Sequence, residues 1–336
     1  MAPNNITLPM TRDNNHDVPI GVTVSYIILS EITSVLILVI NILTVITIAK
    51  VESLHTVMNK LFVNLACADL LLGVSLPYCS LRFYQLDMVY SSLMLEKISC
   101  LVCQYVTLAT ASVSFLGFSL IALDRYLAIT QPLMYHQLMT KKRLLGAVIF
   151  IWLFVFNVLG IMIGLNNWRS GTQCTGLLVL NRAMYSIVIL GLGGLLSITS
   201  AMLYARIFYI AWQQKKRIQA EEISYGQKCA NSDTKMAKTM AMVFCSLCVC
   251  YLPFIIVSVF LRPYTPEERP FWLKISLGYA TIFVYFNSFL NAIIYSWRNK
   301  DFRKAMYQLV FPKKQLIMNV QPTTVFSLDK YISVTN

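Results

Sequence analysis

The chain has 336 residues, of which 57% are hydrophobic and only 13% are charged. Its mean hydropathy of +0.62 excludes a pair of ordinary soluble domains, which the length alone would suggest. A net charge of +13 is typical of proteins that bind nucleic acid or anionic lipid, but here most basic residues lie between long apolar runs. The charge must therefore be interpreted together with membrane topology.

Seven apolar segments are long enough to cross a bilayer as helices, which takes about 20 residues each. None shows the alternating pattern of a membrane β-barrel strand. We therefore predict an all-α membrane protein, built as a seven-transmembrane helix bundle. The predicted spans cover residues 22–49, 61–84, 100–129, 144–165, 184–212, 236–261 and 273–297.

The distribution of lysine and arginine predicts which way the bundle faces. An odd number of spans places the two termini on opposite sides, and the side of the C-terminal tail carries twenty of the 28 basic residues. The positive-inside rule therefore predicts an extracellular N-terminus and a cytoplasmic tail. A glycosylation sequon at Asn5 agrees, because such glycans are attached on the extracellular side. The charge is thus explained without a nucleic-acid partner.

The chain divides into four parts. An extracellular tail of residues 1–21 precedes the seven-span domain of residues 22–298, whose one long loop covers residues 213–235. Residues 299–310 alternate basic residues with Phe302, Met306 and Leu309, which predicts a short membrane-parallel eighth helix in contact with lipid. Residues 311–336 lack periodicity, and we expect a disordered cytoplasmic tail there.

Asp69 is the one carboxylate that we expect within the bundle, and it lies mid-span. A charged group there costs roughly 2.5–3.5 kcal/mol, so it needs a partner or a cation. The functional interpretation is a hydrated cation or proton site, and the alternative is polar contact between helices. The polar residues available to it are Asn41, Ser114, Asn287, Ser288 and Asn291.

The third span has a stripe of residues that crosses the whole membrane. Cys100 and Arg125 are 25 residues apart, which is about 37 Å of helix and almost seven turns, so both face the same way. At the outer end, Cys100 can form a disulfide with Cys174, which we expect in an extracellular loop. The alternatives are two free thiols, or Cys103 as a competing partner.

The inner end of that stripe is the triplet Asp124, Arg125 and Tyr126. Asp124 supplies a local counter-charge to Arg125. Asp233 opens the sixth span at the same membrane level, so an Arg125–Asp233 pair could bridge spans three and six, and breaking it would permit an opening at the inner end. The alternative is that both side chains are solvated. Pro253 predicts a kink in span six, either a hinge or a static bend.

Together these residues resemble the rhodopsin-like (class A) G-protein-coupled receptors, over roughly residues 22–310. The resemblance implies that Asp69, Ser114, Asn287, Ser288 and Asn291 form a sodium pocket, which makes a sodium ion the only cofactor to expect. It also implies activation switches at Arg125, Tyr204 and Tyr295. The matching positions are Asn41, Asp69, Cys100, Asp124, Arg125, Tyr126, Trp152, Tyr204, Pro253, Asn291, Tyr295 and Phe302.

The resemblance implies a multi-pass plasma-membrane receptor that binds an extracellular ligand and activates a heterotrimeric G protein, with arrestin as a further candidate partner. Leu133 would contact the G protein. No catalytic constellation is present, so we do not expect an enzyme. The alternatives are a transporter or channel, although no internal repeat supports one, and a decoy receptor without G-protein coupling.

The chain departs from the family at several activation positions. Tyr251 replaces the usual tryptophan two residues before Pro253, Ala292 replaces the proline of span seven, and Leu196 lies near the place of the missing span-five proline. These changes predict altered activation energetics, while the intact Asp124, Arg125 and Tyr126 favour a receptor that signals.

The expected ligand cavity carries no formal charge. Thr107 stands where amine receptors have a carboxylate, and Tyr285 stands where opsins have a lysine. Residues 204–208 look most like the adenosine-receptor branch, but Ser258 and Tyr285 replace its ligand-binding residues. We therefore expect a neutral or weakly polar small molecule. The cavity residues would be Thr107, Leu108, Ala111, Phe254, Ser258, Thr281 and Tyr285.

Overall fold

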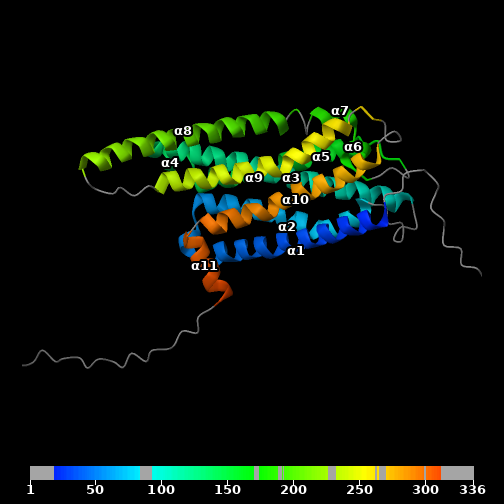
Figure 1. Ribbon diagram of the computed structural model, residues 1–336, viewed down its shortest axis with the longest axis horizontal. Helices are drawn as coiled ribbons and strands as arrows, with labels where there is room; N and C mark the ends of the chain where they lie inside the picture. The colour runs from blue at the N-terminus through cyan, green and yellow to red at the C-terminus, as the bar shows by residue number, and fades with distance from the viewer. Residues whose placement is uncertain are drawn as a thin grey trace, which may run out of the picture.

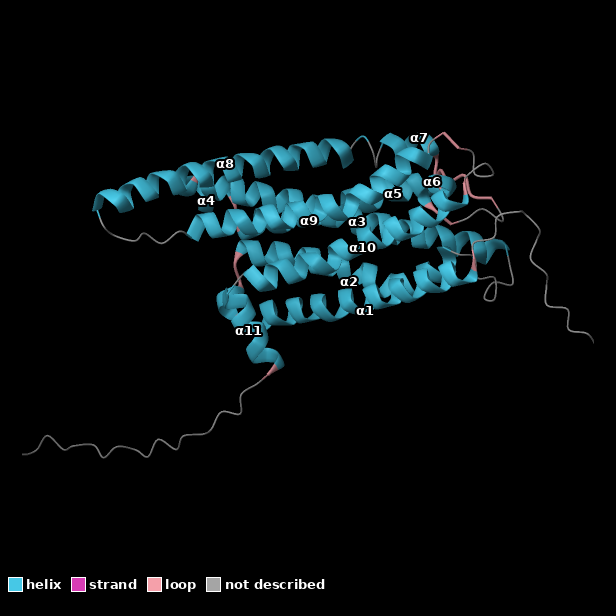
Figure 2. Ribbon diagram, viewed as in Figure 1, coloured by secondary structure: helices cyan, strands magenta, loops and turns pink. Residues whose placement is uncertain are grey.

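The computed structural model is a bundle of long helices that lie side by side (Figures 1 and 2). It describes residues 19–83, 93–169, 174–187, 191, 193–225, 232–261, 263–264, 270–298 and 300–311. No strand occurs among these residues, which confirms the all-α fold class. The predicted glycan acceptor Asn5 and residues 312–336 of the predicted tail lie outside the described residues.

Seven long helices form the described part of the bundle and correspond to the seven predicted spans. They are α1 (Ile20–Lys50), α2 (Val57–Phe83), α3 (Leu93–Thr130), α5 (Lys141–Gly164), α8 (Gly193–Tyr225), α9 (Ser232–Leu261) and α10 (Phe271–Arg298). By length and composition, α1, α2, α3, α5 and α10 can each cross a membrane, and α9 contains a shorter apolar stretch, Cys245–Leu261.

Short elements mark the two ends of the bundle. The α11 end carries η1 (Glu52–Leu54), α4 (Pro132–Leu138) and α11 (Lys300–Val310), whereas the α7 end carries α6 (Gly176–Val179) and α7 (Arg182–Tyr185) (Figure 1). Because α8 continues to Tyr225 and α9 begins at Ser232, most of the stretch 213–235, which we predicted to be a long loop, is helical.

The first helix, α1, places apolar side chains outside and mainly polar side chains inside. On α1 the exposed side chains include Val24, Ile28, Ile32, Val35 and Val39. The buried ones on the same helix include Ser30, Thr33, Ser34, Asn41 and Thr44. This arrangement suits lipid, where apolar side chains need no cover and buried polar groups bind neighbouring helices.

The packing order places α3 at the centre of the bundle. It contacts α2, α5 and α8, while α10 lies between α1 and α9. The predicted stripe along the third span therefore faces the interior. Thr140 caps the start of α5 by accepting a hydrogen bond from the backbone N–H of Arg143 at 3.3 Å.

The described residues of the fifth predicted span are not all α-helical. After α7 ends at Tyr185, Ser186, Ile187 and Gly191 have π-helical geometry, and α8 begins at Gly193. A Cβ atom at Gly194 would meet no neighbouring atom within 4 Å, so close packing does not explain that glycine.

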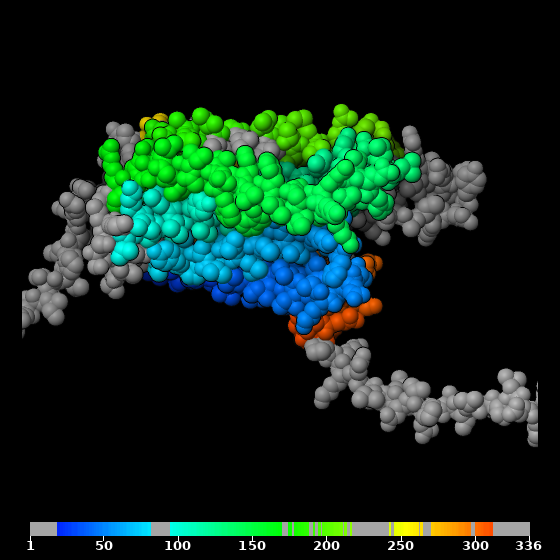
Figure 3. All heavy atoms as spheres, turned by 180° about the vertical axis from the view of Figure 1, so that it is seen from behind, coloured from blue at the N-terminus to red at the C-terminus, as the bar shows by residue number. Residues whose placement is uncertain are grey.

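The predicted amphipathic helix is present as α11. It turns away from α10 and lies against the first helix, beside the blue surface in Figure 3. Phe302 and Ala305 face inward, whereas Tyr307 and Val310 are exposed. The Phe302 ring meets the Tyr295 ring edge-on, with 4.9 Å between centroids, and so ties α11 to the end of α10.

Candidate functional site

A cavity of about 380 Å³ lies within the bundle toward the α7 end. A small molecule fits a space of this size. Its walls come from α2, α3, α5, α8, α9 and α10, and residues 174–176 line it as well. The structure brings all seven predicted pocket residues to this wall: Thr107, Leu108, Ala111, Phe254, Ser258, Thr281 and Tyr285.

The cavity wall is neutral, and some of its buried hydroxyls lack a hydrogen-bond partner within the described chain. None of the described residues that line it is charged. The hydroxyls of Thr107 and Thr281 donate to backbone carbonyls of their own helices, at 2.7 and 2.8 Å. By contrast, the buried hydroxyls of Ser258 and Thr175 have no hydrogen-bond partner within the described chain. These two hydroxyls are therefore available to a bound molecule.

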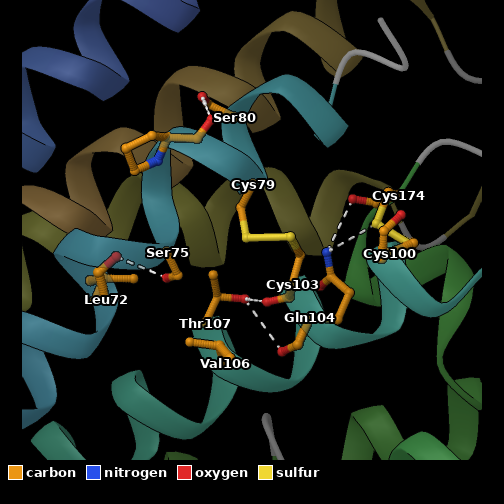
Figure 4. Close-up of a disulfide and its surroundings, with 12 residues drawn as sticks. Leu72, Ser75, Cys79, Ser80, Cys100, Cys103, Gln104, Val106, Thr107 and Cys174 are labelled. Atoms are coloured by element: carbon orange, nitrogen blue, oxygen red, sulfur yellow. Dashed lines mark hydrogen bonds between the residues drawn. A yellow bond between two sulfur atoms is a disulfide. The ribbon is translucent and has the colours of Figure 1, made fainter. Parts of the chain in front are cut away.

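The predicted disulfide between Cys100 and Cys174 is formed, with 5.6 Å between the Cα atoms. Gln104 holds the same loop, because its side-chain N–H donates to the carbonyl of Cys174 at 3.1 Å. Cys103, the competing partner, pairs instead with Cys79 of α2 (Figure 4). This second disulfide was not predicted, because Cys79 looked like one more small residue in an apolar run.

Asp69 lies at the centre of a buried polar cluster below the cavity. Its carboxylate is 1% exposed and accepts a hydrogen bond from Ser114 at 3.3 Å. The other carboxylate oxygen, the side-chain oxygen of Asn287 and both polar side-chain atoms of Asn291 have no partner among the described residues. Asn41 is different, since it donates to the carbonyls of Ile37 and Ser288 and so serves as interhelical contact.

The unpartnered oxygens around Asp69 fit a hydrated monovalent cation. One carboxylate with neutral amide and hydroxyl oxygens is a donor set for a hard ion, and unpaired buried polar atoms call for water or an ion. No cluster of three His, Cys, Asp or Glu side chains occurs in the described part of the chain. Ser114 and Ser288 also line the ligand cavity, so the two sites adjoin.

Asp69 is not the only carboxylate within the bundle, which corrects our expectation. Glu31 lies well inside α1 and accepts a hydrogen bond from Ser80 of α2 at 2.9 Å. Ser80 is buried. The residue was visible within predicted span 22–49, but its partner depends on how α1 and α2 pack together.

At the α11 end, Asp124 binds two side chains. The buried carboxylate accepts hydrogen bonds from Arg125 Nε at 2.8 Å and from the Tyr135 hydroxyl at 2.7 Å. Burial, together with the hydrogen bond to Asp124, raises the pKa of Tyr135 to about 12, so its phenol remains a donor at physiological pH. Tyr135 belongs to α4, and we did not predict its role. The side chain of Asp233 lies outside the described residues, and with it the predicted Arg125–Asp233 bridge.

The two predicted switch tyrosines bind different neighbours. Tyr204 donates to the carbonyl of Phe118 on α3 at 3.4 Å. Tyr295 donates to the side-chain oxygen of Asn59 and stacks on Phe62, with 3.8 Å between ring centroids. Sequence reasoning missed Asn59, which also donates to the carbonyl of Leu54 at 2.6 Å.

The remaining predicted positions connect the cavity with the α11 end. Tyr251 lines the cavity and packs against the apolar cluster that contains Tyr204 and Tyr295. Pro253 lies inside α9, as predicted, and Tyr126 packs against the same cluster. Leu133 is 93% exposed on α4, as a contact with a partner protein requires.

Comparison with known proteins identifies the family. Residues 40–295 match the 7 transmembrane receptor (rhodopsin family). The histamine H2 receptor of Cavia porcellus is 30% identical over 301 residues, which cover 85% of this chain and 80% of the relative. The alpha-1A adrenergic receptor of Oryzias latipes is 28% identical, covering 92% and 72%. The adenosine receptor A2b of Homo sapiens is 25% identical, covering 85% and 89%. The chain therefore belongs to the rhodopsin family of seven-transmembrane receptors, the G-protein-coupled receptors.

Proposed function

We propose that this receptor binds a neutral or weakly polar small molecule at its α7 end, on the extracellular side, and activates a heterotrimeric G protein. The carrying observation is the cavity itself, whose described wall has no charged side chain and two unpartnered buried hydroxyls, Ser258 and Thr175. A ligand with neutral polar groups can satisfy both hydroxyls without desolvating an ion.

The ligands in the names of two relatives, histamine and adenosine, are not proposed as ligands of this cavity. A protonated amine needs an anionic partner, and Thr107 occupies the wall where amine receptors have a carboxylate. Adenosine recognition is not proposed either, since Ser258 and Tyr285 replace that branch's ligand-binding residues. A neutral ligand, in a receptor akin to the adenosine branch, agrees best with these side chains.

The ligand would act by binding the open state of the α11 end better than the closed one. Tyr251 lines the cavity and contacts the apolar cluster of Tyr204 and Tyr295, so it is positioned to couple ligand binding in the cavity to a change in that cluster. Opening requires that the Asp124 carboxylate release Tyr135 and Arg125, which then become available to the G protein.

The test is a screen of neutral and charged small molecules against the full chain, with G-protein recruitment as the readout and Arg125→Ala as the inactive control. Among hits, Ser258→Ala is expected to weaken binding about three- to tenfold, the value of one neutral hydrogen bond of roughly 0.5–1.5 kcal/mol. Ser276→Ala, an exposed serine bonded to its own helix, is the matched control. Hits confined to amines, or binding without nucleotide exchange on any G protein, would refute the proposal.

We further propose that Asp69, Ser114, Asn287, Ser288 and Asn291 hold a sodium ion that favours the closed state. The ion would supply a positive charge that neutralises Asp69 and would use the unpartnered oxygens around it. Replacing sodium by N-methylglucamine should raise basal nucleotide exchange in the wild type but not in Asp69→Asn, with Glu52→Gln as the exposed control. An Asp69→Asn variant that keeps its sodium sensitivity would overturn this assignment.

A further inference from the structure

The Cys79–Cys103 disulfide lies in the wall of the ligand cavity. It joins α2 to α3, with 5.5 Å between the Cα atoms, and both cysteines line the cavity. Figure 4 shows it beside Gln104 and Thr107, one helical turn from Cys100. Thr107 fixes the local helix by donating to the carbonyl of Cys103 at 2.7 Å. Molecules that enter the cavity therefore meet this disulfide.

The two disulfides of the described chain differ in how well their sulfur atoms are covered. Cys100 and Cys174 are both buried, in an apolar cluster with Val179. Cys103 is likewise buried at 2% exposure, but its partner Cys79 is only partly buried. Thiol–disulfide exchange requires a thiolate to reach one sulfur atom, so access favours attack at Cys79.

The same disulfide determines how the end of α2 is held. Pro77, two residues before Cys79, interrupts the backbone hydrogen bonding of α2. Beyond Pro77, Cys79 bonds covalently to α3, and the adjacent Ser80 donates to Glu31 of α1. If the disulfide were reduced, the end of α2 would no longer be bonded to α3. The hydrogen bond from Ser80 to Glu31 of α1 would then be the nearest polar contact that holds it.

We propose that Cys79–Cys103 is a thiol-reactive site, at which small uncharged organic thiols that enter the cavity reduce the disulfide and release α2 from α3. The thiolate attacks the sulfur of Cys79, the S–S bond breaks, and Cys103 leaves as a thiolate that takes a proton from water. A second small-molecule thiolate then attacks the small-molecule sulfur of the mixed disulfide, which yields the symmetric disulfide of the small thiol and releases Cys79 as a thiolate that takes a proton from water. A thiol that carries a further anionic group reacts more slowly, because its thiolate brings a second negative charge into the neutral wall, which offers that charge no partner.

The test uses the full-length receptor in lipid nanodiscs. The free cysteines of the described chain, which are Cys67, Cys245, Cys248 and Cys250, are first blocked by alkylation together with Cys229, which lies outside the described residues. The protein is then exposed to 2-mercaptoethanol or to anionic 2-mercaptoethanesulfonate, alkylated with a second reagent and analysed by mass spectrometry. We expect label at Cys79 and Cys103 at least tenfold faster than at Cys100 and Cys174, and faster with the neutral thiol. Equal rates for the two disulfides, or equal rates for the two thiols, would overturn the proposal.

A second arm measures the structural consequence with the Cys79→Ala/Cys103→Ala double variant. The neutral thiol should lower the thermal unfolding temperature of the wild type to that of the double variant, and it should leave the double variant unchanged. A shift of equal size in both proteins would contradict the assignment. Neither arm needs a ligand or a G protein, so failure of the proposed receptor function would not be mistaken for failure of this site. If the double variant does not fold, the labelling experiment on the wild-type receptor still tests the proposal.

Discussion

Asp124 shows how a single buried side chain can hold two others in place. Its carboxylate is fully buried and binds Arg125, its neighbour in the chain, and Tyr135 from the separate helix α4. Each hydrogen bond to a charged group strengthens the arrangement more than a neutral one would. Tyr135 therefore stabilises the buried carboxylate that holds Arg125 in place.

Removing the Tyr135 hydroxyl should weaken that hold. In Tyr135→Phe, Asp124 loses one charge-assisted donor at a cost of about 1.5 kcal/mol, which predicts roughly a tenfold rise in basal nucleotide exchange. The measurement is guanine-nucleotide exchange on reconstituted G protein without ligand. Tyr307→Phe, an exposed tyrosine of α11, is the matched control. Basal exchange at or below the wild-type level in Tyr135→Phe would show that the hydroxyl does not restrain Arg125.

At the scale of elements, α1 and α2 approach each other closely because residue 73 has no side chain. A Cβ atom there would lie 3.0 Å from the Leu38 side chain, and Ser34 donates to the carbonyl of Gly73 at 2.8 Å. Small residues at such crossings are how membrane helices gain packing contacts.

Gly73→Val should push the two helices apart. Overpacking of this kind costs typically about 1–3 kcal/mol, so the thermal unfolding temperature in detergent should fall by several degrees. Gly160→Val makes the same chemical change on α5, where a Cβ would meet no atom within 4 Å, and should cost little. Equal shifts in the two variants would mean that helix propensity, and not the α1–α2 contact, determines the loss.

For the whole molecule, the charge distribution predicts one orientation in the membrane. An epitope tag placed before Met1 should be accessible to antibody on intact, unpermeabilised cells, while a tag after Asn336 should require permeabilisation. Asn5→Gln should also abolish the mobility shift produced by glycosidase treatment. The reverse accessibility of the two tags would contradict the assignment of twenty basic residues to the cytoplasmic side.

The spans were predictable because each is a long apolar run, and a seven-helix bundle follows from their number. The pocket residues were predictable from the resemblance to a known receptor family, and the Asp69 cluster from the polar residues within apolar spans together with that resemblance. The contacts between side chains of different helices were not predictable. Cys79 with Cys103, Tyr135 with Asp124 and Tyr295 with Asn59 all depend on the register between neighbouring helices, which no single helical pattern encodes. The π-helical geometry in the fifth span was likewise invisible to hydropathy, since a π-helical turn is as apolar as the helix around it.

The contact between Glu31 and Ser80 also has a consequence for biosynthesis. An acidic side chain opposes insertion of an isolated first helix, and only the strongly apolar remainder of α1, with a hydropathy of 2.6, offsets it. Its hydrogen-bond donor arrives with α2, some fifty residues later in translation. The first two helices should therefore leave the translocon as a pair, and Ser80→Ala should slow the release of α1 into lipid before any effect on the mature receptor appears.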